Sequence, residues 1–181
     1  MPDNAQPQSI LKFWRDAGPQ KWFRKDPAFD ATFREEFFEA HQSAARRQLA
    51  HWMDSADGAL GLLLLLDQYP RNAFRDTAHM FATDPLARLY ARQMIERGLD
   101  RQVDGTLRAF CYLPFEHSED ADDQRMAVEL CDTLDPETAR FARLHAEIIE
   151  RFGRFPHRNE ALARQSSEAE KSFLAEGGFA G

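Results

Sequence analysis

Three Asp-Pro pairs mark helix starts along this chain, and they constrain its fold more than any other feature of the sequence. They are Asp26-Pro27, Asp84-Pro85 and Asp135-Pro136. An Asp carboxylate accepts hydrogen bonds from the free N–H groups of a first helical turn, and a proline at the next position loses no helical hydrogen bond. Each pair therefore predicts the start of an α-helix.

The residues after each pair have helical periodicity. After Pro136, apolar residues recur at spacings of three and four, which places them on one helix face; they are Phe141, Leu144, Ile148, Ile149 and Phe152. His145 lies in the same stripe and is more simply a hydrogen-bonded core histidine than a functional one. The stripe after Pro27 predicts a long helix reaching Trp52, and the helix after Pro85 is expected to end at a left-handed Gly98.

The other helices fill the intervals between these three. We expect them over residues 9–17, 55–68, 106–115 with a bend at Pro114, 119–134, and from a capping box at Ser167 and Glu170 to Gly177-Gly178. No stretch alternates with a period of two, so no sheet is predicted. The prediction is an all-α fold of about eight or nine antiparallel-packed helices in a single domain over residues 1–181, with residues 1–8 and 177–181 as flexible ends.

Charge and composition exclude several classes of partner. Thirty acidic against twenty-three basic residues give a net charge of −7, which argues against nucleic acid and against anionic membranes. The most apolar run, Leu60–Leu66, is far shorter than a membrane span. Cys111 and Cys131 lack metal or redox spacing and are expected to be buried free thiols, so the cytoplasm is the predicted location.

Two polar corners carry the main functional signal. Each follows an apolar helical run, turns at an aromatic-Pro step and presents an Arg-Asn pair, at residues 67–72 and 152–159. The arginine fork matches a carboxylate or a phosphate, and asparagine adds a short donor and acceptor. The residues that we expect to bind a ligand are those of the two corners, together with two from residues 114–119: Asp67, Gln68, Arg71, Asn72, Arg154, His157, Arg158, Asn159, Glu116 and His117. The alternative is structural, with these side chains capping helix ends or pairing with internal acids.

Asp67 needs a partner because it follows five consecutive leucines at the mouth of the expected core. A half-buried carboxylate there requires a cation or several donors. Arg71 lies four residues on, but the intervening Pro70 argues against helical pairing of the two side chains.

A third polar corner spans residues 114–119, where Glu116 and His117 are followed by further acids. They indicate either a general acid/base pair or a metal site, or else acids that complement a helix dipole with Ser118 or Asp120 as the cap. No His-x-x-x-His or Glu-x-x-His spacing is present, and no nucleotide-binding or nucleophile motif either. We therefore predict no metal and no cofactor.

These motifs together resemble a known family. Residues 64–72 (LLLDQYPRN) with 81–85 (FATDP), residues 114–119 (PFEHSE) with Gln124, and residues 151–159 (RFGRFPHRN) are similar to its three signatures. The family is a widespread bacterial group catalogued as a domain of unknown function, with an all-helical fold similar to tetratricopeptide repeats. The resemblance spans nearly the whole chain and implies that fold, with no established activity. Residues 163–167 depart from the expected pattern.

Three functional hypotheses follow. The first is a non-catalytic binding module in which the two corners receive a small anionic molecule or peptide. The second is a small hydrolase or lyase in which His117 or His157 acts as the acid/base, oriented by Asp67, Glu116 or Glu119. The third is a structural or oligomeric partner protein, and homo-oligomer formation is left open. We favour the binding module, and the sequence does not decide whether the chain is an enzyme.

Overall fold

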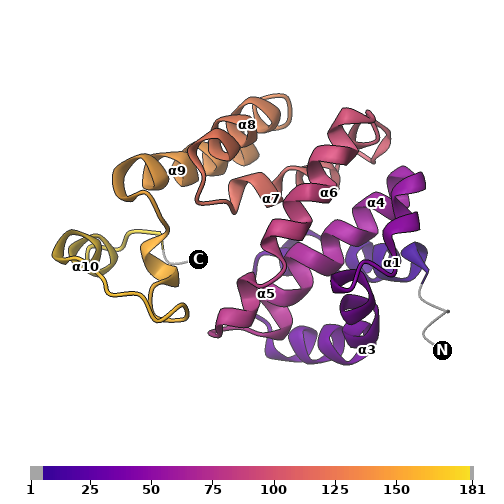
Figure 1. Ribbon diagram of the computed structural model, residues 1–181, viewed down its shortest axis with the longest axis horizontal. Helices are drawn as coiled ribbons and strands as arrows, with labels where there is room; N and C mark the ends of the chain where they lie inside the picture. Colours follow the sequence, from indigo (N-terminus) through magenta and orange to yellow (C-terminus); the bar gives the residue numbers. More distant parts are fainter. Residues whose placement is uncertain (1–5, 180–181) are drawn as a thin grey trace. The chain divides into compact units, whose positions relative to one another are not determined.

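The computed structural model describes residues 6–179, and this range is all-helical with no β-strand (Figure 1). The all-α prediction is confirmed. The chain forms two compact units, the first made of Met1–Arg75 and His79–Pro114, the second of Asp76–Ala78 and Phe115–Gly181. Organisation as a single domain stays a prediction. Of the two ends expected to be flexible, residues 1–5 and 180–181 lie outside the described residues. No helix within residues 6–179 is long and apolar enough to cross a membrane.

The first unit contains most of the helices. In chain order they are α1 (Pro7–Ala17), α2 (Pro19–Trp22), α3 (Pro27–Ala45), η1 (Ala50–Asp54), α4 (Ala56–Leu63), η2 (Leu64–Gln68), α5 (Tyr69–Ala73), η3 (Ala78–Phe81), α6 (Asp84–Glu96), η4 (Asp100–Gln102), η5 (Arg108–Cys111) and α7 (Leu113–Glu116), the last running into the second unit. The long helix predicted after Pro27 ends at Ala45, so Trp52 belongs to η1 instead. The single helix predicted over 106–115 is two short ones, because Pro114 lies in the first turn of α7.

All three Asp-Pro pairs stand at the start of a helix as predicted, and in two of them the Asp side chain caps that helix. The Asp26 carboxylate accepts from the N–H groups of Ala28 and Phe29 at 3.1 Å, and Asp135 caps its helix in the same way at 3.0 Å. Asp84 is the exception, because α6 already includes it and Thr83 occupies the cap position. The Asp84 carboxylate is instead used in an ion pair with Arg71.

The core of the first unit combines a cluster of aromatic rings with a run of buried leucines. α1 packs on α4, α3 on α5, and α4 on α6. Trp14 and Trp22 are stacked, and Trp22 donates its indole N–H to the Trp14 carbonyl at 2.7 Å. Phe110 meets both indoles edge-on. The leucines from Leu60 to Leu66 are fully buried, and burying each is worth about 2 kcal/mol.

A π-helical turn, η2, replaces the corner expected at Tyr69-Pro70. Because Pro70 has no N–H and its ring crowds the preceding turn, the regular hydrogen-bond ladder cannot pass it. The Tyr69 N–H bonds to the Leu64 carbonyl five residues back, and the chain stays helical into α5. Two side chains bond to the carbonyls next in line: His41 Nδ1 to Leu65 O at 2.8 Å, and Thr83 Oγ1 to Leu66 O at 2.6 Å.

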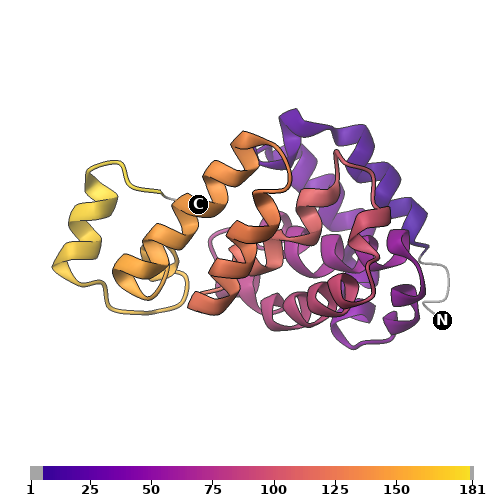
Figure 2. The same ribbon diagram turned by 90° about the horizontal axis from the view of Figure 1, so that it is seen from above.

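The second unit is built around a pair of helices, α8 (Ala121–Cys131) and α9 (Pro136–Phe152), followed by η6 (Pro156–Arg158) and α10 (Glu168–Ala175). α8 and α9 lie side by side in both views (Figures 1 and 2), and the short loop between them makes them antiparallel. Asp120 caps α8, and the capping box at Ser167 and Glu170 opens α10, as predicted. α9 ends at Phe152 and is capped by Gly153, whose φ of 69° lies in the left-handed region.

Candidate functional site

In the first Arg-Asn corner, two carboxylates hold the arginine inside the first unit. Arg71 donates Nη1 and Nη2 to the two Asp84 oxygens at 2.8 and 3.0 Å, and Nη1 lies 3.2 Å from Asp67 Oδ1. Asp67 is 1% exposed. The expectation that Pro70 prevents Asp67–Arg71 pairing is wrong, because the chain stays helical through the proline and keeps the i,i+4 geometry.

The amides of the same corner extend this network. Gln68 donates to Asp67 Oδ2 at 2.6 Å, and Asn72 donates to the Gln68 carbonyl at 3.3 Å. Asn72 Oδ1 accepts from Arg75 at 2.6 Å, and Arg75 forms a two-bond ion pair with Asp30 of α3. The corner thus ties α3, α5 and α6 together, which is the structural alternative weighed from the sequence.

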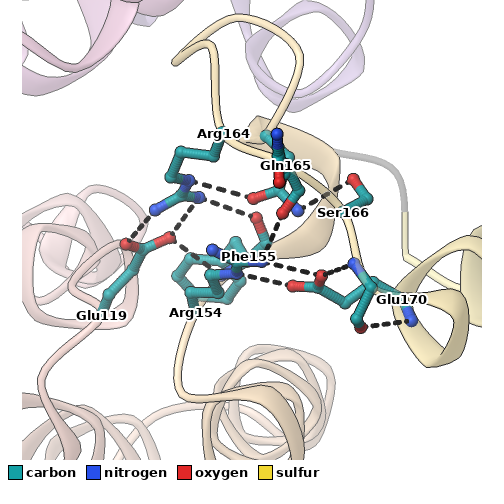
Figure 3. Close-up of polar contacts among 9 residues, drawn as sticks. Glu119, Arg154, Phe155, Arg164, Gln165, Ser166 and Glu170 are labelled. Carbon is teal, nitrogen blue, oxygen red and sulfur yellow. Dashed lines mark hydrogen bonds and ion pairs between the residues drawn. The ribbon is translucent and has the colours of Figure 1, made fainter.

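The second corner is organised by two further ion pairs in the second unit (Figure 3). Arg154 donates Nε and Nη2 to Glu170 of α10 at 2.6 and 2.8 Å, and Nη2 also reaches the Gln165 carbonyl at 2.8 Å. Hydrogen bonds from Arg154 lower the pKa of the Glu170 carboxyl well below its ordinary range. Arg158 is buried, with its guanidinium 4.4 Å from the Phe155 ring centroid.

Arg164, which the sequence did not single out, is the centre of this corner. It binds both oxygens of Glu119 at 2.7 and 2.9 Å, the Phe155 carbonyl at 3.1 Å and Asn159 Oδ1 at 3.0 Å (Figure 3). Glu119 also accepts from the Phe155 N–H at 2.8 Å. Burial raises the pKa of Glu119, but these hydrogen bonds outweigh it and leave the pKa below its ordinary value.

The third corner brings a carboxylate against a histidine. Glu116 Oε1 lies 3.0 Å from His145 Nδ1, which also lies 2.8 Å from the Phe141 carbonyl. Both side chains are buried, at 4% and 6% exposure. His145 is hydrogen-bonded in the core as predicted, yet it is also the histidine beside an acid, a role that the sequence reasoning gave to His117 or His157. The rings of His117 and His145 are 6.4 Å apart.

His157 lies beside this pair and is held uncharged. Its ring is 5.6 Å from that of Phe155, and its Nδ1 atom is buried with no hydrogen-bond partner among residues 6–179. Burial, reinforced by the positive charge of Arg158 and by the neighbouring histidines, lowers the pKa of His157 to about 3. At neutral pH it is therefore a neutral ring. We call Glu116, His117, His145 and His157 the histidine cluster.

An open surface pocket of about 520 Å³ lies next to the second corner. It is lined by Arg151, Phe152, Arg154, Ser167, Ala169 and Glu170. The Arg151 guanidinium stacks over the rings of Phe152 and Phe173, 4.7 and 5.5 Å from their centroids. Its side chain is exposed and makes no ion pair within the described part of the chain. The same part of the chain holds no group of three His, Cys, Asp or Glu residues placed to bind a metal.

These observations define an all-helical protein whose polar corners are ion-pair and histidine clusters at helix ends. Residues 10–178 match the family described as bacterial proteins of unknown function (DUF924), and the chain belongs to this family. The family resemblance seen in the sequence is thereby confirmed.

The structure of the protein of unknown function ATU0120 from Agrobacterium tumefaciens is similar, at 51% identity and a TM-score of 0.93, over 94% of this chain and 97% of that one. No curated protein matches the chain. The binding role of the residues selected from the sequence stays a prediction.

Proposed function

We propose that this protein is a non-catalytic binding module for a small anionic group, either a carboxylate or a phosphate, free or at the end of a peptide. The pocket that two guanidinium groups line, those of Arg151 and Arg154, carries the proposal. Arg71 is unsuited to this role, because it is buried against Asp67 and Asp84.

The charges around the pocket favour an anion over a cation. Glu170 and Arg154 neutralise each other, so the remaining charge is that of Arg151. Ser167 and Ala169 belong to the start of α10, where the helix dipole is positive. Stacking on Phe152 and Phe173 orients the Arg151 guanidinium and leaves its N–H groups for a ligand. The net charge of −7 opposes long-range attraction of anions, so recognition depends on these short-range contacts.

Titration with inorganic phosphate and with acetate, followed by amide chemical shifts, tests this function. We expect saturable shifts at residues 151–154 and 167–170, and their loss in Arg151→Gln. Arg140→Gln is the matched control: Arg140 lies on the same helix and stacks on its own neighbour, Phe141, at 4.4 Å, but does not line the pocket. Equal losses in both variants, or no saturable shift with either anion, would refute the proposal.

One observation favours a second candidate, a small hydrolase or lyase. The 3.0 Å contact between Glu116 Oε1 and His145 Nδ1 places a carboxylate beside an imidazole, as in a carboxylate-oriented general base. In this proposal His145 replaces His117 and His157 as the acid/base. Turnover of small chromogenic carboxylic and phosphoric esters that disappears in His145→Gln and survives in the exposed His51→Gln would support it. Turnover that is unchanged in His145→Gln would exclude it.

Three finer expectations belong with these proposals. The antiparallel pair α8 and α9 supports stacking of the tetratricopeptide-repeat kind. The two buried free cysteines, Cys111 and Cys131, support a reducing compartment such as the cytoplasm. Formation of a homo-oligomer is tested by light scattering of the purified chain.

A further inference from the structure

We propose that the C-terminal turn Gly177–Phe179 is a detachable lid over the histidine cluster of the second unit. Phe179 lies edge-on to two of its members, with ring centroids 4.5 Å from His145 and 5.3 Å from His157. It also packs on the small apolar cluster of Ile148, Ile149 and Phe155. The Phe179 ring thus contacts two histidines of the cluster at once.

Two glycines bring the ring into this position. Gly177 has a φ of 84°, a left-handed conformation that favours glycine, and donates to the Leu174 carbonyl at 3.2 Å. Gly178 donates to the Phe173 carbonyl at 2.9 Å. A Cβ atom at Gly178 would lie 2.5 Å from that oxygen and 2.6 Å from the Phe173 ring, so no larger residue fits without moving the turn. The reversal after α10 therefore depends on both glycines.

The lid makes few contacts, and a buried polar atom next to it, Nδ1 of His157, has no hydrogen-bond partner within the described range. Phe179 is only half-buried, and the residues just before it, Ala175–Gly177, are exposed. Closing the lid gains aromatic contacts but deprives the His157 nitrogen of water, whereas opening it restores hydration. Because the gain and the cost of closing the lid partly cancel, the free energy of opening it is small. Segments of this kind open locally without unfolding of the rest of the protein.

Opening the lid changes what the second unit can bind. The place left by Phe179 adjoins the imidazole rings of His145 and His157, and His145 is also in contact with Glu116 at 3.0 Å. Once uncovered, this place accepts another aromatic ring. This inference does not depend on the anion pocket, because it involves none of the residues that line it.

Chemical modification of the histidines tests the lid. Carbethoxylation of each histidine is followed by peptide mass spectrometry, with the exposed His51 as the fast internal standard. In the natural chain we expect His145 and His157 to react much more slowly than His51. Phe179→Ala and Gly178→Ala should each accelerate both sites about tenfold or more, because either change releases the turn. Phe23→Ala in the first unit and Gly105→Ala, where an added Cβ meets no atom within 4 Å, are the matched controls.

The Cys131 thiol separates lid opening from unfolding of the unit. Cys131 is fully buried in α8 and should stay unreactive toward a thiol reagent in both lid variants. Histidine rates that stay at the natural level in Phe179→Ala would overturn the lid. Simultaneous exposure of Cys131 would also overturn it, since the turn would then hold the whole unit together.

Discussion

Arg164 donates two hydrogen bonds to Glu119, a residue 45 positions earlier in the chain, at 2.7 and 2.9 Å. The same guanidinium binds the Phe155 carbonyl and Asn159, so one side chain joins the loop before α8 to the segments on both sides of η6. A planar group with donors in fixed directions suits four such acceptors, whereas an ammonium does not.

Replacing Arg164 by lysine should therefore destabilise the second unit. Lysine keeps the charge but loses the fork, and we expect a loss of about 1–2 kcal/mol. Hydrogen exchange of the amides of residues 154–170 measures the effect locally. Arg125→Lys, which alters an exposed ion pair with Asp122 on α8, should leave exchange unchanged. Equal exchange rates in the two variants would contradict the central role of Arg164.

Removing Arg71 should be more costly than removing one of its acids. Arg71→Met leaves both Asp67 and Asp84 buried without their cation, at a cost of about 3–5 kcal/mol. Asp84→Asn keeps Arg71 paired with Asp67 and should cost about half as much. All three tryptophans lie in the first unit, which also contains Arg71, so their fluorescence during urea denaturation reports on the unfolding of that unit. A reversed order of stability would show that the ion pair with Asp67 is not formed in solution.

Thr83 should matter through its hydroxyl alone. Its Oγ1 bonds to the Leu66 carbonyl in the π-helical turn, and Thr83→Val keeps the shape but leaves that buried carbonyl without its donor. We expect a loss of about 1–3 kcal/mol, again by tryptophan fluorescence in urea. Thr83→Ser retains the hydroxyl and should recover most of the loss, and a serine variant as unstable as the valine variant would rule out this explanation.

Stability should decline in mild acid because of His157. Its pKa is lowered from 6.5 to about 3 in the folded chain, so the unfolded chain binds the proton more readily. The contribution of the neutral His157 ring to the free energy of unfolding is fully present above pH 6.5. It is lost as the pH falls toward 3, by about 1.4 kcal/mol per pH unit. Urea denaturation between pH 7 and 5, followed by circular dichroism, measures the slope.

His157→Gln should flatten this decline by about 2 kcal/mol over the interval from pH 6.5 to 5. His51→Gln, at an exposed position, serves as the control and should keep the natural slope. An unchanged slope in His157→Gln would mean that this ring is already hydrated in the folded chain.

Local chemistry explains which features could be predicted from the sequence. Asp26, Asp135 and the Ser167–Glu170 capping box act within one helical turn, so their neighbours in the chain suffice to predict them. Asp84 has the same sequence signal, but Arg71, thirteen residues away, takes its carboxylate.

The site depends on partners that no local pattern specifies. Glu119 and Arg164 are too distant in the chain for spacing to pair them, and no sequence signal marked Arg164. His145 lies on an apolar stripe, which correctly predicts its burial. Its contact with Glu116 arises only when α7 and α9 come together.

The proline in the leucine-rich segment also has a consequence for how the first unit folds. Pro70 interrupts the hydrogen-bond ladder, and the carbonyls of Leu65 and Leu66 receive donors from α3 and from the residue before α6. A peptide covering α4, η2 and α5 alone lacks both donors, so its most apolar stretch cannot complete its own backbone pairing. The segment from α4 to α5 is therefore expected to become stable only when α3 and the residue before α6 pack against it. The first unit should then fold cooperatively and not one helix at a time.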